Sequence, residues 1–296
     1  MAIERYFCVD AGATRSRGRL CDAGGRELAY AEAGPANASY DREQAVASIL
    51  DLWHQLNAGT GLDAEDRADT AFAIGGAGLY VEKPREAFLA RCPAFGATIA
   101  MSDGYAALIG AGGGRPCALL TIGTGVAGHR LFEDGTSIQR DAWGWIVGDR
   151  GSGSWLGREA VRHALEVRDG IAPSSALSCA VMEHVGGARG ILDGAFAGLN
   201  AHRLASFAPL VLEGAGTGCP VAAEILSRGL VYLAALVGTL RCGDVPLYLN
   251  GGLAGVLQAG LVAHIGRPVQ AAEGDPLQGC LLVAQGRAPV ERMILE

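Results

Sequence analysis

Short apolar runs alternate with small-residue turns at the start of the chain. The runs Tyr6–Val9 and Arg17–Cys21 predict two strands, separated by the turn Asp10–Thr14. Asp22–Gly25 has the composition of a hairpin turn, and Glu27–Ala31 continues as a third strand. The chain is therefore expected to open with three strands, the first two of which are joined by a turn rich in alanine and glycine.

The next segment alternates helical and strand spacing. Apolar residues recur at helical intervals over 41–56, and strands are predicted at Ala71–Ile74 and Thr98–Met101. The second of these strands ends in Ser102-Asp103-Gly104, and a helical pattern follows over Tyr105–Ala111. This alternation predicts an α/β unit, in which ligands bind at the carboxyl ends of strands.

The opening pattern then recurs. Cys117–Ile122 predicts a strand, Gly123-Thr-Gly125 a turn, and Val126–Phe132 a further strand that ends in hairpin residues. The rest is rich in helical pattern, with one strand at Leu247–Leu249 that is broken by Asn250-Gly-Gly252. The chain is thus a weak internal duplication of strand, turn, strand and hairpin.

The duplication predicts two lobes. We place the N-terminal lobe at 1–112 and the C-terminal lobe at 113–296, and a final helix near 276–286 is expected to pack back on the first lobe. A length of 296 residues is comfortable for two lobes.

Composition narrows the class of protein. Half of the residues are apolar and 19% are charged, as in an ordinary globular enzyme. The net charge is −7 and no run of Lys or Arg occurs, so no nucleic-acid surface is expected. The eight cysteines form no CxxC pair and several lie in apolar runs, which predicts reduced thiols in a cytoplasmic protein.

Two segments bear on targeting. The N-terminus carries Glu4 and Arg5 where a secretory signal would be apolar. The most apolar long stretch, Val221–Leu240, contains Glu224 and Arg228, which favours a buried amphipathic helix over a membrane span. No membrane partner is expected.

Two turns have the character of phosphate loops. In Asp10–Thr14, small residues let the backbone approach a phosphate, successive N–H groups form an anion nest, and Thr14 adds a hydroxyl. Asp10 suits contact with a Mg²⁺ ion carried by ATP, directly or through water. Taken alone, the turn is equally consistent with an ordinary hairpin. Gly123-Thr-Gly125, however, is a second turn of the same kind, and two such loops can hold one triphosphate.

Three further motifs have a functional and a structural interpretation. Asp103 is either a base that accepts the proton of a substrate hydroxyl or a helix N-cap. The segment Trp143–Gly153 offers aromatic faces and the Asp149 carboxylate to a sugar, or is a structural loop. Asn250–Gly252 permits close contact with a flat ligand such as adenine, or is a tight turn. The six histidines show no metal-ligand spacing.

Together these motifs resemble the sugar kinase–actin–heat-shock ATPase superfamily, and more closely its N-acetylglucosamine kinase family with the bacterial glucosamine kinases. The similarity spans nearly the whole chain and is strongest in VDAGATRSR, MSDGYAALIGA, TIGTG, WGWIVGDRGSGSWLGREA and LNGGLA. The resemblance implies a two-lobed, ribonuclease-H-like α/β fold of the actin-like ATPase type with a central cleft. It further implies ATP-dependent phosphorylation of the 6-hydroxyl of glucosamine or N-acetylglucosamine, Mg²⁺ as the companion of ATP, and a homodimer.

The resemblance also carries roles onto residues. It places ATP-binding residues in the first phosphate loop, the second phosphate loop and an adenosine loop: Asp10, Gly12, Ala13, Thr14, Thr124, Gly125, Gly251 and Gly252. Asp103 matches the catalytic base. The residues matched to sugar contact are Asn37, Asp103, Trp143, Gly144 and Asp149.

Departures and alternatives accompany this assignment. Val126 stands where a Ser often follows the second loop, and Arg150 stands beside Asp149 where the family has an acidic or neutral residue. One alternative is an activator-type ATPase of the same superfamily, which would hold an iron–sulfur cluster on cysteines at a dimer interface. Another is a non-catalytic sugar sensor, although we expect no DNA-binding domain ahead of the first loop.

Overall fold

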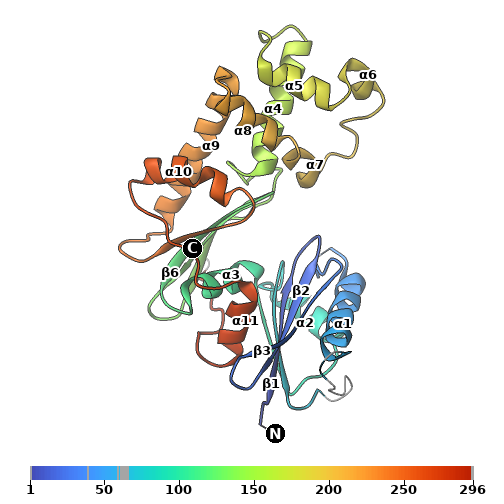
Figure 1. The fold of residues 1–296 in the computed structure, drawn as a ribbon, viewed down its shortest axis with the longest axis vertical. Coiled ribbons are helices and arrows are strands. Elements are labelled where there is room, and N and C mark those ends of the chain that lie inside the picture. The colour runs from blue at the N-terminus through green and yellow to red at the C-terminus, as the bar shows by residue number, and fades with distance from the viewer. Residues whose placement is uncertain (1, 39, 59, 61–66, 295–296) are drawn as a thin grey trace. The chain divides into compact units, whose positions relative to one another are not determined.

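The computed structural model describes residues 2–38, 40–58, 60 and 67–294, which form a mixed α/β structure with two sheets (Figure 1). The chain divides into two compact units. Unit 1 consists of Met1–Leu119, His129–Ile138 and Ala271–Glu296, and unit 2 consists of Leu120–Gly128 and Gln139–Gln270. Each unit is therefore assembled from segments that are separated in the sequence.

The sheet of unit 1 mixes antiparallel and parallel pairing. Its strands lie in the order β3-β2-β1-β4-β5. β1 pairs antiparallel with β2 and parallel with β4, and β4 pairs parallel with β5. The strands are β1 (Arg5–Ala11), β2 (Ser16–Asp22), β3 (Glu27–Ala33), β4 (Thr70–Gly76) and β5 (Ala97–Met101).

Side chains of β1 alternate between two covered faces. Phe7 and Val9 face the core beneath α1 (Arg42–Ala58), where Phe7 stacks with Phe72 and contacts Trp53. The opposite face is covered by α3 (Asp103–Gly112) and α11 (Pro276–Ala284), which pack against each other and against the sheet. Burial of both faces explains why β1 and β4 are nearly continuous apolar runs.

The packing of α3 on α11 depends on a close backbone approach. A Cβ atom on Gly279 would lie 1.9 Å from the carbonyl oxygen of Ala106, so only glycine fits there. The helix predicted near 276–286 is thus observed as α11, and it packs within unit 1 on a helix that lies far from it in sequence.

The second sheet has the order β8-β7-β6-β9. Its strands are β6 (Cys117–Ile122), β7 (Val126–Leu131), β8 (Ser137–Asp141) and β9 (Leu247–Asn250), and the first three have residues in both units. The helices of unit 2 are α4 (Gly153–Arg168), α5 (Ala176–His184), α6 (Gly187–Leu192), α7 (Ala201–Ala205), α8 (Ala208–Gly216), α9 (Pro220–Thr239) and α10 (Ala254–Ile265).

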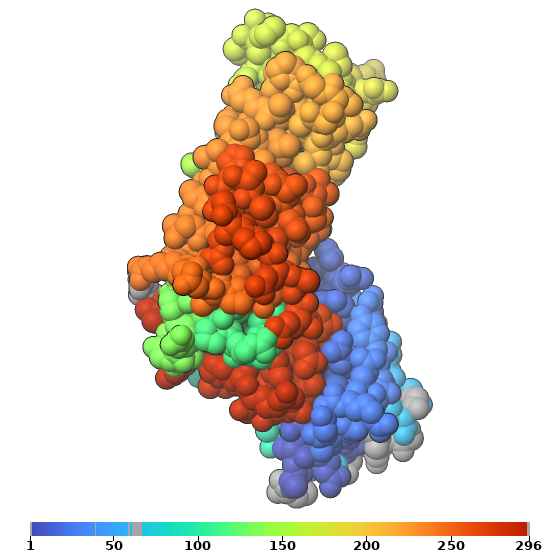
Figure 2. All heavy atoms as spheres, turned by 60° about the vertical axis from the view of Figure 1, so that its left-hand side comes forward, coloured from blue at the N-terminus to red at the C-terminus, as the bar shows by residue number. Residues whose placement is uncertain are grey.

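The apolar stretch near 221–240 forms α9. It is the one helix among the described residues that is long and apolar enough to cross a membrane, judged by length and composition only. α9 packs against α8, α10 and α4, and buries Ile225, Leu233 and Leu236 on the covered side. Arg228, on its remaining face, is exposed. Figure 2 shows part of the chain near α9, in orange, at the molecular surface.

Candidate active site

In unit 1, three parallel strands end at the same edge of the sheet. β1, β4 and β5 end at Ala11, Gly76 and Met101, and the register pairs Ala11 with Gly76 and Gly75 with Met101. Strands two places apart are separated by about 10 Å, which is twice the interstrand spacing. Asp10 and Asp103 therefore stand at neighbouring points of one edge, where parallel sheets bind ligands.

Asp10 is held by an arginine across the first hairpin. Its Oδ2 atom accepts hydrogen bonds from Arg17 Nη2 at 2.5 Å and Arg17 Nε at 3.1 Å. Burial raises the pKa of Asp10, the Arg17 guanidinium opposes that rise, and the charge of Asp103 adds to it. The sequence prediction did not include Arg17, although the turn length alone sets the antiparallel register that pairs Asp10 with Arg17.

The first phosphate turn leaves its tip open. Ala13 and Thr14 are exposed. The carbonyl oxygen of Gly12 accepts a hydrogen bond from the Ala36 N–H at 3.0 Å. That bond brings the half-buried Asn37, which was predicted to contact the sugar, beside the loop predicted to bind phosphate.

Asp103 begins α3 but does not cap it. The N-cap is Ser102, whose Oγ accepts a hydrogen bond from the Tyr105 N–H at 3.1 Å. The alternative interpretation of Asp103 as the N-cap is therefore wrong. The Asp103 side chain is exposed, and its Oδ1 accepts the Gly104 N–H at 2.9 Å. The Asp103 carboxylate thus stands at the start of a helix and is open to solvent.

A residue near the C-terminus secures the start of α3. Glu291 accepts the Ser102 N–H at 2.7 Å on Oε2 and the Ser102 hydroxyl at 2.6 Å on Oε1. The Tyr105 hydroxyl also donates to the carbonyl oxygen of Pro289 at 2.8 Å. Burial raises the pKa of Glu291, while the two Ser102 hydrogen bonds oppose the rise. Nothing in the local sequence pattern indicates a contact between residues so distant along the chain.

In unit 2, the second phosphate loop lies on the first turn of α4. The Gly153 N–H donates to the carbonyl oxygen of Gly123 at 2.8 Å, and the Ser154 N–H donates to that of Thr124 at 3.1 Å. Helix N-termini carry partial positive charge, which favours a bound anion. The structure thus joins the Gly123–Gly125 turn to the segment that begins α4.

Asp149 faces this loop. Its Oδ1 accepts the Val126 N–H at 3.1 Å, and a Cβ atom on Gly125 would lie 2.9 Å from its Oδ2, so Gly125 makes room for the carboxylate. Asp149 is buried with φ of 58°, and its own N–H donates to Asp141 Oδ1 at 3.1 Å. Burial raises the pKa of Asp149, and the Val126 N–H opposes that rise. Val126 therefore contributes its backbone, since its side chain is buried.

The segment ahead of Asp149 presents apolar side chains to solvent. Trp143 is 76% exposed, and Ile146 and Val147 are also exposed. Gly144, with φ of 84°, makes the turn between them. An exposed indole face suits stacking on a sugar ring. Arg158 of α4 holds this segment through an Nη1 hydrogen bond to the carbonyl oxygen of Trp145 at 2.6 Å.

The predicted adenosine loop lies against the end of β6. Gly251 has φ of 94°, and a Cβ atom there would lie 2.4 Å from the carbonyl oxygen of Ile122, whereas Gly252 is open. The Leu253 N–H also donates to Ile122 O at 3.0 Å. Since Ile122 precedes the second phosphate loop, unit 2 brings these two predicted nucleotide loops together.

The donor set fits a magnesium ion that arrives with ATP. Among the described residues no group of three or more His, Cys, Asp or Glu side chains could hold a metal ion. Nucleotide-bound Mg²⁺ requires only one or two protein carboxylates besides the phosphates and water. Asp10, at the edge of the first phosphate turn, fits that requirement, because both hydrogen bonds from Arg17 reach its Oδ2 atom and not Oδ1.

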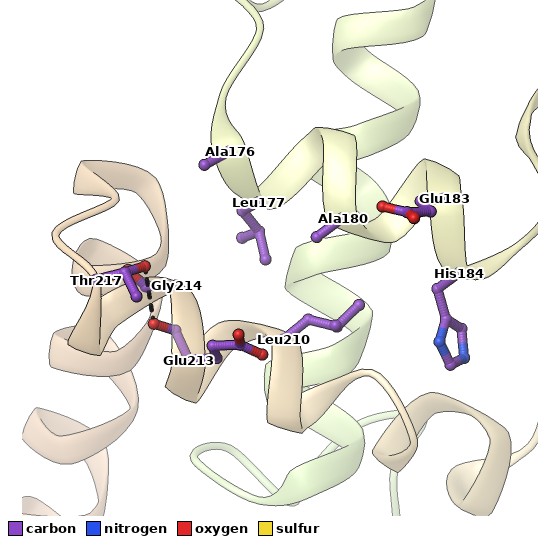
Figure 3. Close-up of a pocket in the computed structure, with 9 residues that line it drawn as sticks. All are labelled: Ala176, Leu177, Ala180, Glu183, His184, Leu210, Glu213, Gly214 and Thr217. Atoms are coloured by element: carbon purple, nitrogen blue, oxygen red, sulfur yellow. Dashed lines mark hydrogen bonds between the residues drawn. The ribbon is translucent and has the colours of Figure 1, made fainter.

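A separate cavity of about 470 Å³ lies between α5 and α8 (Figure 3). Leu177 and Leu210 form part of its lining, and Glu183 and Glu213 stand on its two sides. None of the predicted site residues lines it. It is therefore distinct from the candidate active site.

The mixed α/β structure with its two sheets is of the actin-like ATPase type, as predicted. Residues 8–275 match the BadF/BadG/BcrA/BcrD ATPase family, and the chain belongs to that family. The chain is 25% identical over 283 residues to "Glucosamine kinase GspK" of Vibrio cholerae, covering 94% of this chain and 95% of that protein.

Solved structures of other proteins share this fold. A protein from Chromobacterium violaceum described as "Putative N-acetylglucosamine Kinase" is 30% identical, with a TM-score of 0.88 over 95% of this chain and 99% of that one. A ROK family glucokinase from Streptomyces griseus, in complex with glucose and AMPPNP, shares the fold at 19% identity and a TM-score of 0.54, covering 96% and 99% of the two chains. The resemblance found in the sequence is thereby confirmed at the level of family and fold.

Proposed function

We propose that this protein is an ATP-dependent kinase that phosphorylates the 6-hydroxyl of an amino sugar, glucosamine or N-acetylglucosamine. The observation that carries the proposal is the exposed Asp103 carboxylate at the sheet edge that also bears the Asp10 phosphate turn. Membership in an ATPase family and relatives named as sugar and hexosamine kinases support it.

In this mechanism the nucleotide is held by backbone groups. The first loop (Asp10, Gly12, Ala13 and Thr14) and the second loop (Thr124 and Gly125) donate N–H groups to phosphate oxygens. Gly251 and Gly252 lie against adenosine. Asp10 would hold the Mg²⁺ ion of ATP through water, and the ion would supply positive charge to neutralise the phosphates. Asn37, Trp143, Gly144 and Asp149 would position the sugar.

Asp103 then acts on the acceptor. Its carboxylate accepts the proton of the sugar hydroxyl as the hydroxyl oxygen forms a bond to the γ-phosphorus. The bond from that phosphorus to the β–γ bridging oxygen breaks, and ADP leaves. A general base contributes about 10²–10⁴-fold, and positioning together with charge neutralisation supplies the rest.

The substitution Asp103→Asn tests this role. We expect turnover to fall at least ~100-fold, while the KM for sugar changes only a few-fold, because the amide keeps the shape but cannot accept the proton. Asp51→Asn, an exposed carboxylate on α1, is the matched control and should leave turnover unchanged. Near-normal turnover in Asp103→Asn would refute the assignment.

The substrate is identified by a coupled ADP-release assay with glucosamine, N-acetylglucosamine, N-acetylmannosamine and glucose. We expect one of the first two to give the highest kcat/KM, with phosphorus–proton NMR placing the phosphate on O6. Preference for glucose would contradict the amino-sugar assignment, and a sensor that only binds sugar would release no ADP. A homodimer in the cytoplasm stays a prediction, tested by light scattering and cell fractionation.

The activator alternative finds little support in the cysteines. All eight are free, six are buried, Cys92 is half-buried, and Cys179 alone is exposed. A cluster bridging two copies commonly takes four thiolates, two from each chain. One fully exposed thiol per chain does not provide that set.

A further inference from the structure

Four arginines converge on one cavity of unit 2 that the proposed mechanism does not use. The cavity measures about 320 Å³ and lies between α4 and α9. Its lining consists of Arg150, Arg158, Arg162 and Arg228, together with Trp155, Tyr232 and Glu159. We call these residues the arginine pocket.

The charges of the arginine pocket do not balance. Glu159 is its one carboxylate, and its side chain is only 11% exposed. It pairs with Arg228 Nη2 at 3.0 Å and with Arg162 Nη1 at 3.4 Å. Among the lining residues, four guanidinium groups against one carboxylate leave an excess of three positive charges. Two further carboxylates lie outside the lining: Asp141 accepts the Tyr232 hydroxyl, and Asp149 interacts with Arg158.

The guanidinium groups are also held in place. Arg228 lies 5.4 Å from the ring centroid of Trp155, and Arg150 lies 5.6 Å from that of Tyr232. Tyr232 is itself fixed by a hydrogen bond from its hydroxyl to Asp141 Oδ2 at 2.9 Å. Aromatic faces that support guanidinium groups reduce the entropy lost when those groups bind an oxyanion.

One arginine retains an unused donor. Arg158 Nε is buried and has no hydrogen-bond partner, and its distance to Glu159 Oε1 is 3.9 Å. A buried donor without a partner costs free energy, and a ligand oxygen would relieve that cost. Arginine suits phosphate especially, because its planar set of donors matches two oxygens at once.

We propose that the arginine pocket binds a phosphate group, either inorganic phosphate or the phosphate of a small phosphomonoester, and that this binding is linked to the sugar segment through Arg158. The link is the hydrogen bond from Arg158 Nη1 to Trp145 O. An anion that attracts the Arg158 guanidinium competes with that bond and so shifts the Trp143–Gly148 segment. A volume of 320 Å³ lies at the lower end of the range for small-molecule sites.

The binding test needs no activity. Isothermal titration calorimetry with inorganic phosphate, in chloride buffer of fixed ionic strength, should show saturable binding with a Kd below about 10 mM. The double variant Arg162→Gln/Arg228→Gln should weaken it at least ~10-fold. The control Arg168→Gln/Arg189→Gln removes two exposed arginines of the same unit and should bind as the wild type does. Equal affinity in all three proteins, or no saturable binding to the wild type, overturns the proposal.

Further titrations identify the ligand, and a further variant keeps the test valid if the double variant does not fold. Glucosamine 6-phosphate and glycerol phosphate, titrated in parallel, distinguish a phosphomonoester site from one that prefers free phosphate. Arg150→Gln, which leaves the Glu159 pairs intact, should weaken binding even if the double variant does not fold. The proposed link between the arginine pocket and the sugar segment rests on the proposed function. We expect 5 mM phosphate to change the sugar KM about two-fold or more in the wild type and not in the double variant. If phosphate binds to the wild type but leaves its sugar KM unchanged, the proposed link between the arginine pocket and the sugar segment is wrong, although the phosphate site stands. If the protein shows no kinase activity, the phosphate titration still tests the site by itself.

Discussion

Gly251 and Gly252 are adjacent in the chain but differ in what surrounds them. Gly251 has a positive φ and lies against the Ile122 carbonyl, whereas Gly252 has open space where a Cβ atom would be. The first glycine is required by the fold of unit 2. The second has no such requirement, so any effect of its replacement reports on a ligand.

Alanine substitutions separate these roles. Gly251→Ala should destabilise the protein by about 1–3 kcal/mol, because it combines backbone strain with overpacking. Gly252→Ala should change stability by less than about 0.5 kcal/mol but raise the KM for ATP if adenosine lies against it. Thermal unfolding and ATP titration measure the two effects. Wild-type stability of Gly251→Ala would contradict the packing argument, and a wild-type ATP KM for Gly252→Ala would remove it from the adenosine loop.

The positions of single residues of the candidate site were predictable where the residue follows the end of a strand. Asp10 and Asp103 each follow an apolar run, and a parallel sheet brings such ends together. The hydrogen bond from Val126 to Asp149 and the pair of Asp10 with Arg17 were not predicted. They depend on register and on a loop conformation with positive φ, which apolar periodicity does not encode.

At the scale of elements, the start of α3 is fastened to the segment that follows α11. Two hydrogen bonds from Ser102 to Glu291 make this connection, and the Glu291 side chain is half-buried. Since Asp103 is the next residue after Ser102, Glu291 is a positioning residue for the proposed base. Because burial raises the pKa of Glu291, this connection is sensitive to pH.

The sign of that sensitivity follows from the pKa. Glu291 has a pKa raised above its ordinary value of 4.5 by burial, so the folded state keeps the proton to higher pH than the unfolded chain does. The free energy of unfolding therefore falls as pH rises from about 4.5 through the folded-state pKa. The variant Glu291→Gln has no carboxylate to ionise, so this fall in the free energy of unfolding is absent. The stability of the variant relative to the wild type should therefore increase with pH between about 4.5 and the folded-state pKa of Glu291.

Urea unfolding at a series of pH values between 4 and 8 measures the difference. Asp10 and Asp149, whose pKa values are also raised by burial, are present in both proteins and cancel. Glu86→Gln, an exposed glutamate on α2 (Glu82–Leu89), is the control and should show a flat difference. A flat difference for Glu291→Gln as well would contradict the assignment.

The strands and several helices were predictable because they carry a clear period, whereas the helical pattern of the second half did not place α5, α6, α7, α8 or α10 individually. Strands β1 to β7 and β9 and helices α1, α3, α9 and α11 appear where apolar spacing places them, within a few residues. The polar helix α2 contains Pro84, and the short strand β8 is polar, so neither has an apolar period to detect. These elements are specified by their neighbours in the fold.

At the scale of the whole molecule, the proposed reaction draws on residues from both units. Asp10, Asn37 and Asp103 belong to unit 1, and Thr124, Asp149 and Gly252 belong to unit 2. Phosphoryl transfer to a sugar, without loss of the phosphoryl group to water, requires that water is excluded from the reacting groups. We therefore expect the protein to become more compact when it binds both substrates.

Small-angle X-ray scattering tests this expectation. A non-hydrolysable ATP analogue together with the preferred hexosamine should reduce the radius of gyration more than either ligand does alone. Asp103→Asn, which is expected to bind both substrates without turnover, should show the same reduction with ATP itself. An unchanged radius of gyration with both ligands present would count against closure.

The interleaving of the two units also sets an order in which the protein is made. α11, which covers one face of β1 and β4, begins at residue 276, whereas α3 ends at residue 112. At typical rates of translation the ribosome adds the intervening residues in roughly 10–30 s, and during that time this apolar face is covered by α3 alone. Unit 2 is complete by residue 270, before unit 1 receives its last segment. The unit that starts the chain is thus the last to be finished, and its apolar face stays partly exposed while unit 2 is synthesised.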